Sequence, residues 1–205
     1  MPEEKLIIDP AAHPALSIYK LLIGSVVPRP IAFVSSISAD GVYNLAPFSF
    51  FNAVCAEPPV ITFACGVRVP EKDTLANVRA TGEFVVNSVS EEIAAQMNLC
   101  SGEYIAGVDE FQVSGLTPVR SDLVRPPRVA ESLINMECKV VQIVDVSKRP
   151  HGGSLVIGEV VRFHINRGLF ENFRIDPEEL HAIGRMGGAG YTRTRDRFEM
   201  ERPRV

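Results

Sequence analysis

PRPIAFVSSISADGVYNLAPFSFFNAVC, residues 28–55, is the stretch that decides the fold. Its first part, 31–37, is an apolar run with two serines and predicts a strand. Asp40-Gly41 is a hairpin turn signal, so a second strand should return beside the first. The returning segment, 44–55, mixes aromatic residues with Pro47. This combination predicts one strand with a bulge or bend at the proline, because proline cannot donate to a central ladder.

Short strands and turn signals continue through the rest of the chain. Pro58-Pro59 precedes a buried strand at 60–65, and further strands are predicted at 83–89, around 136–144 and at 154–165. A helix should begin near 73, capped by Asp73 or Thr74 and ended by Gly82. A second, short helix is predicted at 91–99. Many short strands with few helices predict a mainly-β fold, either a barrel or a sandwich.

The composition is that of a globular chain. It has 205 residues and a mass of 22.5 kDa, with 46% hydrophobic and 22% charged residues, which suits one domain or two small ones. No apolar run approaches the ~20 residues that span a bilayer, and the N-terminus lacks the pattern of a secretory signal. A net charge of −4 gives no overall attraction to nucleic acid or anionic lipid. We therefore expect a cytoplasmic protein with no nucleic-acid or membrane partner.

The four cysteines form neither a C-x-x-C pair nor a zinc-finger spacing. Cys55, Cys65 and Cys138 lie in apolar, strand-like runs and are expected to be buried. Cys100 lies in a polar stretch and is expected to be exposed. The pattern favours a reducing compartment.

Residue types alone leave the chemistry of the site open. Lys72 and Thr74 stand at a predicted helix start, where free N–H groups and the positive end of the helix dipole could bind a phosphate. Ordinary capping with solvated charges explains the same residues and is the better default. Phe48, Phe50 and Phe51 could flank a planar ring, but core packing is again the default for aromatic side chains.

Other catalytic chemistries find less support in the sequence. The four histidines are widely spaced, and the chain has no H-E-x-x-H, G-x-S-x-G or Walker motif. The glycine-rich run 184–190 is interpreted as a loop. Asp109-Glu110 and Glu178-Glu179 are interpreted as solvated faces. The residues therefore predict no metal site and no catalytic acid or base.

Several motifs, in order, resemble the flavin reductase-like family, the FMN-binding split barrels that include flavoredoxin. The run 28–36 looks like the entry strand of that family, and 44–52 resembles its N-x-A-P-x-S-x-F-N segment. Lys72-Asp73-Thr74 with Asn77 resembles its K-D-T-x-x-N motif, and 82–87 and 158–160 match in type and order. The resemblance implies a Greek-key split β-barrel with a few short helices. It implies one domain, 1–205, with a core at about 19–165 and a C-terminal extension at 166–205.

The resemblance also implies a site for FMN. The residues that would line the ring and ribityl chain come from the first hairpin and its continuation: Arg29, Pro30, Ile31, Ala32, Ser35, Ser36, Asn44, Ala46, Pro47, Ser49, Phe50, Phe51 and Asn52. Lys72, Asp73 and Thr74 would hold the phosphate. Members of the family are typically homodimers with flavin sites near the subunit interface. Hydride transfer from NADH or NADPH to the flavin N5 requires no acid or base, so no catalytic residue is assigned.

One departure from the family pattern bears on activity. Many NADH-dependent members carry G-D-H before the strand that ends in G-E-V, whereas Gly153 stands at the histidine position here, two residues after His151. The tail 183–191 resembles the extended C-terminus of a flavoredoxin-like branch. Its Arg185 and Tyr191 could cover the site, or the tail could be a surface flap or a dimer strap.

Three functions remain open from the sequence. The first is an FMN-dependent oxidoreductase that takes electrons from NAD(P)H or another donor and passes them to a small-molecule acceptor or a redox partner protein. The second is a flavoredoxin-like electron carrier without rapid NAD(P)H turnover. The third is a β-barrel binding module that uses no flavin.

Overall fold

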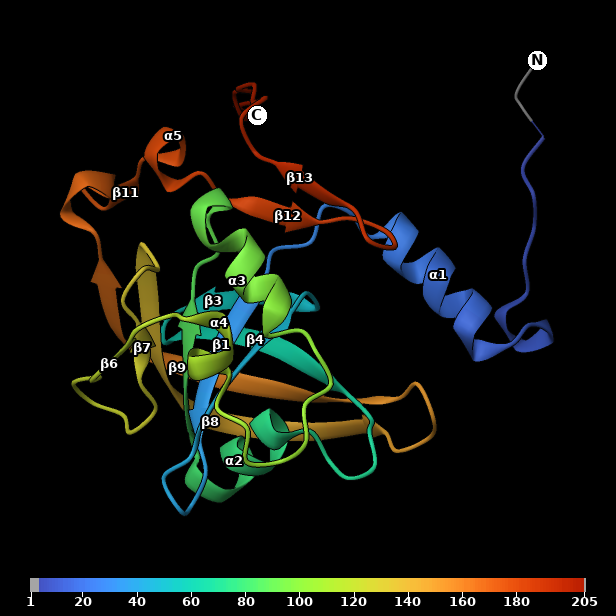
Figure 1. Ribbon diagram of the computed structural model, residues 1–205. Helices are drawn as coiled ribbons and strands as arrows, with labels where there is room; N and C mark the ends of the chain where they lie inside the picture. Colours follow the sequence, from blue (N-terminus) through green and yellow to red (C-terminus); the bar gives the residue numbers. More distant parts are fainter. Residues whose placement is uncertain (1–3, 205) are drawn as a thin grey trace.

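A sheet of seven antiparallel strands is the main element of the computed structural model, which describes residues 4–204 (Figure 1). The strands lie in the order β2-β1-β5-β8-β9-β4-β3, so β2 and β3 form its two edges. Their bounds are β1 Ala32–Ile37, β2 Tyr43–Phe48, β3 Phe51–Ala56, β4 Pro59–Gly66, β5 Glu83–Asn87, β8 Ile134–Ser147 and β9 Gly153–Ile165. The strands expected near 31–37, 60–65, 83–89, 136–144 and 154–165 are confirmed.

The helices are short and lie around this sheet. They are η1 Pro10–Ala12, α1 Ala15–Ser25, α2 Asp73–Thr81, η2 Glu91–Ile93, α3 Ala94–Leu99, α4 Glu110–Ser114, η3 Arg167–Leu169 and α5 Pro177–Leu180. Three small strand pairs complete the chain: β6 Pro118–Val119 with β7 Arg128–Val129, β10 Phe170–Glu171 with β11 Arg174–Ile175, and β12 Ile183–Arg185 with β13 Tyr191–Arg193. The expected mainly-β fold with few short helices is confirmed. Within residues 4–204, no helix combines the length and the apolar character that crossing a membrane requires.

The chain passes from one edge of the sheet to the other through two residues. β2 ends at Phe48 and β3 begins at Phe51, so Ser49 and Phe50 alone connect them. Laid flat, seven strands span about 29 Å, whereas this link reaches only about 10 Å. The sheet must therefore curl until its edges approach each other. The N–H of Ala64 on β4 donates to the carbonyl of Phe50 at 2.9 Å, which extends the β3–β4 ladder by one residue into the link.

Strand β1 separates two cores, because neighbouring residues of a strand point to opposite faces. All six of its residues are buried. Val34 belongs to the inner core with Phe63 and Phe84, which helix α2 covers through Leu75 and Val78. On the other face, the outer core joins residues of β1 and β2 to α3, α4 and β12: Phe33, Leu45, Met97, Phe111 and Ile183.

The segment 44–55 forms two strands, so the expectation of one strand bent at Pro47 is wrong. Pro47 lies inside β2, opposite Phe33. A proline is tolerated there because β2 is an edge strand with a ladder on one side only. The bend falls at 49–50, and the bulge falls between Ala53 and Cys55 of β3.

Helix α2 begins where the sequence predicts but is capped differently. Its N-cap is Lys72, and no side chain caps the first turn. The expectation that Asp73 or Thr74 is the cap is therefore wrong. Gly82 ends the helix as expected, in the left-handed conformation with φ of 70°, which glycine adopts without strain.

Two of the four cysteine predictions are reversed in the structure. Cys65 and Cys138 are buried as expected, but Cys55 is exposed and Cys100 is buried. Cys55 lies on β3, where 52–56 are exposed because no layer covers this edge. Cys100 follows α3 and packs in the outer core, where burial raises the pKa of its thiol to about 11.

Gly158 on β9 provides a test of the inner core. A Cβ at this position would lie 2.4 Å from Cζ of the buried Phe84 ring. We expect Gly158→Ala to lower the free energy of unfolding by about 1–3 kcal/mol through overpacking, as measured by urea denaturation. Gly66→Ala on the adjacent strand β4 is the matched control, because its Cβ would meet only the carbonyl of Gly152 at 4.0 Å. Equal losses in both variants would contradict this packing.

Candidate functional site

A buried polar cluster lies at the turn end of the β1–β2 hairpin. Ser36 and Asn44 are register partners, so their side chains share the inner face. The Asn44 amide donates to Ser36 Oγ at 3.2 Å and to Thr74 Oγ1 at 2.8 Å. The Asn77 amide also donates to Ser36 Oγ, at 3.1 Å. The structure thus joins the hairpin to the first turns of α2 and brings together three of the residues assigned to FMN.

This cluster retains unused hydrogen-bonding capacity. Ser36 and Thr74 accept hydrogen bonds, but neither hydroxyl donates to any residue in the described range 4–204. Asn44 and Asn77 face an adjoining hollow of about 310 Å³. Because buried polar groups are normally paired, the remaining donors and amide oxygens require water or the polar groups of a ligand.

The N-terminus of α2 lies beside this cluster. Its first-turn N–H groups have no side-chain cap, and they carry the positive end of the helix dipole. Lys72 extends toward β2, with Nζ 5.6 Å from the centre of the Phe48 ring. Arg68 lies 3.9 Å from Asp73 and partly balances its carboxylate. The N–H groups and Lys72 make this end of the site suited to an anion.

The other end of the site is the 49–50 corner. Phe50 is 41% exposed. The remaining residues assigned to the ring are half-buried or exposed in this region: Pro30, Ala46, Pro47, Ser49, Phe51 and Asn52. Because β2 is an edge strand, one side of its backbone remains available to a ligand. The corner therefore offers apolar surface and backbone groups.

Three further assigned residues, Ile31, Ala32 and Ser35, are also buried, which limits what their side chains reach. Ile31 packs in the outer core and Ala32 in the inner core. Ser35 faces away from Ser36, with its hydroxyl donating to the carbonyl of Pro127 at 2.5 Å. The structure therefore does not bring the Ser35 side chain to the cluster on the inner face.

Arg29 is also buried, although the sequence places it in the flavin lining. It is 5% exposed, and its guanidinium lies 5.9 Å from the centre of the Phe50 ring. Its hydrogen bonds run to main-chain carbonyls and to Ser49. Arg29 therefore stabilises the 49–50 corner from the protein interior, through its contact with Ser49.

Glu110 lies in this region, and its interpretation from the sequence as a solvated residue is wrong. Rather than a solvated group, it is a buried side chain at 6% exposure, and it accepts the N–H of Leu45 at 3.0 Å. Burial raises the pKa of the Glu110 carboxyl, and the charge of Asp73 adds to the effect. The carboxyl covers the outer edge of β2 beside Asn44. No local pattern announces this contact, because the two residues are 65 positions apart.

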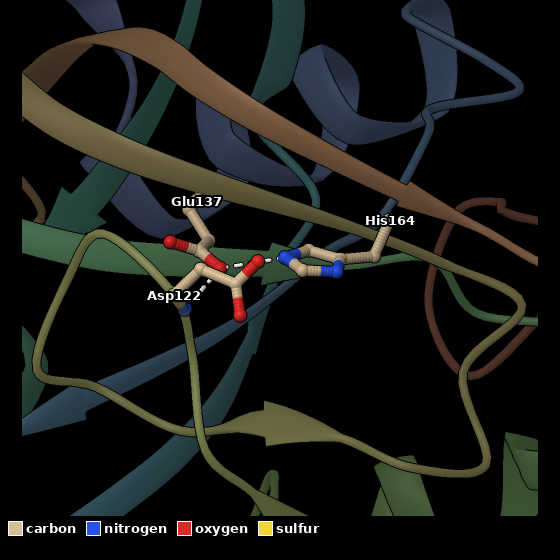
Figure 2. Close-up of side chains that lie close together, drawn as sticks. All are labelled: Asp122, Glu137 and His164. Atoms are coloured by element: carbon tan, nitrogen blue, oxygen red, sulfur yellow. Dashed lines mark hydrogen bonds and ion pairs between the residues drawn. The ribbon is translucent and has the colours of Figure 1, made fainter.

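The structure also assembles Asp122, Glu137 and His164, a group that the sequence did not predict (Figure 2). Possible ligand atoms of the three lie within 4.8 Å of one another. However, both oxygens of the buried Glu137 are already used. Oε1 contacts His164 Nε2 at 2.6 Å and accepts the N–H of Asp122 at 2.8 Å, while Oε2 accepts the N–H of Leu123 at 2.6 Å. These hydrogen bonds give the group a structural role, because they connect the 121–123 loop to strands β8 and β9 of the sheet.

Three arginines of the C-terminal extension contact acidic residues. Arg193 and Arg195 contact the two carboxylate oxygens of Glu91, at 2.5 and 2.7 Å. Arg197 pairs with Glu178. These contacts connect the extension to η2 and α5.

Comparison with known proteins defines the family. A model of the flavin reductase like domain matches residues 23–186, most of the chain. The chain belongs to the flavin reductase-like family. The expected family is thereby confirmed.

Solved structures agree with this assignment. The match to nitrilotriacetate monooxygenase component B from Bacillus cereus has 37% identity and a TM-score of 0.93, over 97% of this chain and 100% of that one. The match to 2-nitrobenzoate 2-nitroreductase from Pseudomonas fluorescens has 34% identity and a TM-score of 0.88, over 97% and 96%. A Shewanella frigidimarina protein with a split barrel domain matches with 22% identity and a TM-score of 0.83, over 94% and 96%.

These findings confirm the split-barrel fold and indicate an oxidoreductase of the flavin reductase type. The last match supports the fold alone, while the family and the first two matches support the class of function. Family membership favours a flavin as cofactor. The residues that contact it stay a prediction from the sequence.

Glu137 gives a pH-dependent prediction. Burial alone would raise the pKa of its carboxyl, but the N–H groups of Asp122 and Leu123 and the ring of His164 outweigh it and hold the pKa below the ordinary range. Because the folded pKa is lowered, the ionised group stabilises the fold above its unfolded pKa of about 4.3. This contribution is lost as the pH falls through the folded pKa.

We expect Glu137→Gln to lower the free energy of unfolding at pH 7 by about 1–3 kcal/mol. The free energy of unfolding of this variant should also fall less steeply than that of the parent as the pH is lowered. Urea denaturation between pH 3 and 7 measures both effects. The control is Glu171→Gln on the exposed pair β10–β11. A Glu137→Gln variant with the same acid slope as the parent would contradict the role given to this carboxylate.

Proposed function

We propose that this protein is an FMN-binding oxidoreductase of the flavin reductase type, with NADH or NADPH as electron donor. The observation that carries the proposal is the buried cluster of Ser36, Asn44 and Thr74 beside the uncapped N-terminus of α2. It combines unused hydroxyl donors and amide oxygens with free N–H groups and Lys72. This is the chemistry that a polyhydroxyl chain ending in a phosphate requires.

The residues fit FMN along the length of β2. Lys72, Thr74 and the N–H groups of α2 would hold the phosphate, and Ser36 and Asn44 would pair with ribityl hydroxyls. The register places four residue steps between the Ser36–Asn44 pair and the Ala32–Phe48 pair, or about 13 Å. The ring would then reach the corner, where Pro47, Phe50 and Phe51 offer apolar surface.

The protein's contribution to the reaction is binding and orientation. The bound isoalloxazine would supply the redox chemistry, accepting hydride at N5 from the nicotinamide. Residues of the corner would hold the ring and exclude water from one face. Main-chain N–H groups of the hairpin would stabilise negative charge at the pyrimidine edge of the ring. No side chain needs to transfer a proton in this step.

A second candidate is a flavoredoxin-like electron carrier that holds FMN without rapid turnover of NAD(P)H. The observation that favours it is the β8–β9 turn, where Gly153 replaces the histidine of many NADH-dependent relatives. His151 stands two residues away and is exposed, in a left-handed conformation with φ of 65°. Its position would place the imidazole differently from a histidine at 153.

We further propose that the protein is a homodimer in the cytoplasm. Helix α1 stands off from the sheet (Figure 1) and buries only Ile23 among its residues. Its Leu16 and Leu22 are 51% and 49% exposed. A second copy would cover this apolar surface. Donor and acceptor would be small molecules, with a redox partner protein as a further acceptor. The net charge of −4 supports the absence of a nucleic-acid partner.

Visible absorption tests the proposed function. We expect purified protein to carry flavin bands or to perturb them when FMN is added, and NADH or NADPH to bleach them anaerobically. Bound flavin that keeps its colour would favour the electron carrier. Absence of any flavin signal would contradict both proposals and favour the flavin-free binding module.

Lys72→Ala tests the phosphate end in the same titration. Loss of a charge-assisted contact should raise the FMN dissociation constant by about tenfold or more. The dissociation constant of riboflavin, which has no phosphate, should stay nearly unchanged. Lys148→Ala removes an equal charge from a side chain that is 85% exposed, and it should change neither constant. An unchanged FMN dissociation constant in Lys72→Ala would contradict the phosphate assignment.

The dimer has its own test. We expect light scattering to give twice the 22.5 kDa chain mass for the parent, and Leu22→Glu on α1 to shift the protein toward monomer. Leu99→Glu on α3 is the matched control, because both leucines are 49% exposed. A parent that is monomeric at micromolar concentration would contradict the proposal.

A further inference from the structure

Arg29 makes an unusual set of contacts behind the 49–50 corner. Its Nη1 donates to the carbonyls of Ile23 and Val26, both at 2.6 Å. Its Nη2 donates to the carbonyl of Met186 at 3.0 Å, and Nε donates to Ser49 Oγ at 3.4 Å. One buried side chain therefore ties the end of α1, the segment after β12 and the corner to one another.

The main chain adds to this tie. The N–H of Arg29 donates to the carbonyl of Arg185 at 2.9 Å, and the N–H of Arg185 donates to the carbonyl of Arg29 at 2.8 Å. Gly184 allows the close approach, since a Cβ there would lie 2.9 Å from Cβ of Pro28. The C-terminal hairpin of β12 and β13 is thus held directly against the segment that precedes β1.

The charge of Arg29 has no acidic partner within residues 4–204. All four guanidinium contacts are to carbonyl or hydroxyl oxygens. Arg185 is in the same situation: it stacks 4.4 Å from the centre of the Tyr191 ring and donates to the carbonyl of Gly188. Burial lowers the pKa of Arg29, and nearby Arg185 lowers it further while Tyr19 opposes this. An arginine nevertheless stays charged in a protein.

A buried cation without a counter-ion is costly, and its field is weakly screened by salt. Arg29 is buried and Arg185 is half-buried, and the main-chain hydrogen bonds between the two residues place both near the end of the site where the ring would lie. Negative charge placed at the corner would therefore be stabilised. A flavin gains negative charge when it is reduced, so the two redox states would not be bound equally.

We propose that Arg29 is a positioning residue for the ring end of the flavin site, where it fixes the corner and, with Arg185, favours the reduced flavin over the oxidised flavin. The inference rests on the proposed function. It assigns the C-terminal hairpin a role in the site, through Arg185 and through the carbonyl of Met186. It also gives the two ends of the site different roles. Lys72 holds the phosphate in either redox state of the flavin, whereas Arg29 and Arg185 act on the ring.

The test compares dissociation constants for oxidised FMN and for FMN reduced with dithionite under anaerobic conditions. We expect Arg29→Met and Arg185→Met each to weaken binding of reduced FMN about tenfold more than binding of oxidised FMN. For a two-electron couple, this ratio corresponds to a midpoint potential lowered by about 30 mV. Arg185→Met keeps the measurement available if Arg29→Met fails to fold, because the Arg185 guanidinium holds only Gly188 and the Tyr191 ring.

Two controls separate charge from position. Arg29→Lys keeps the charge but cannot reach three carbonyls, so both constants should rise while their ratio stays near that of the parent. Lys72→Ala should also raise both constants equally, since it acts at the phosphate. Unlike Lys72→Ala, Arg29→Lys should weaken riboflavin as much as FMN and alter the visible bands of the bound flavin.

The outcomes distinguish this inference from the proposed function. A parent protein that binds no flavin contradicts the proposed function itself. A parent that binds FMN, with an unchanged ratio in both methionine variants, overturns the role of the two arginines and leaves the proposed function intact. Unchanged constants and bands in Arg29→Lys overturn the positioning role.

Discussion

The two-residue link between β2 and β3 is the constraint on which the rest of the structure depends. It joins opposite edges of a seven-stranded sheet, so the sheet has to curl, and β1 is enclosed between an inner and an outer core. Arg29 contacts the link through Ser49 at 3.4 Å, and Ala64 on β4 contacts it through the carbonyl of Phe50 at 2.9 Å.

Curling the sheet gives the β1–β2 hairpin two chemically different ends. At the turn end, α2 packs over Ser36 and Asn44, and the polar cluster there has capacity left for a ligand. At the corner end, the Phe50 ring lies 5.9 Å from the guanidinium of the buried Arg29. Between them, the outer side of β2 has no partner strand, and Glu110 binds the N–H of Leu45 there. An edge strand exposes a side without a partner strand, which favours aggregation of a monomer. In this protein the same side can contact an elongated, partly aromatic ligand.

Sequence patterns predicted the parts of this arrangement that depend on local chemistry. The strand at 31–37, the helix ended by Gly82 and the family motifs all depend on neighbouring residues. The errors arose where a distant segment decides the outcome. Pro47 fits inside a strand because no strand pairs with the far side of β2, Cys55 is exposed because no layer covers β3, and Glu110 is buried because it reaches Leu45, 65 positions away. The cluster of Ser36 and Asn44 was predictable from the hairpin, but its closure by Asn77 needed the packing of α2.

Arg29 shows how a motif residue can serve a site without facing it. The family pattern places it among flavin contacts, yet its guanidinium points to the carbonyls of Ile23 and Met186. The arginine therefore joins the end of α1 and the segment after β12 to the corner. A cation buried among carbonyls can do this without an acidic partner, and the absence of that partner leaves its positive charge uncompensated beside the proposed ring site.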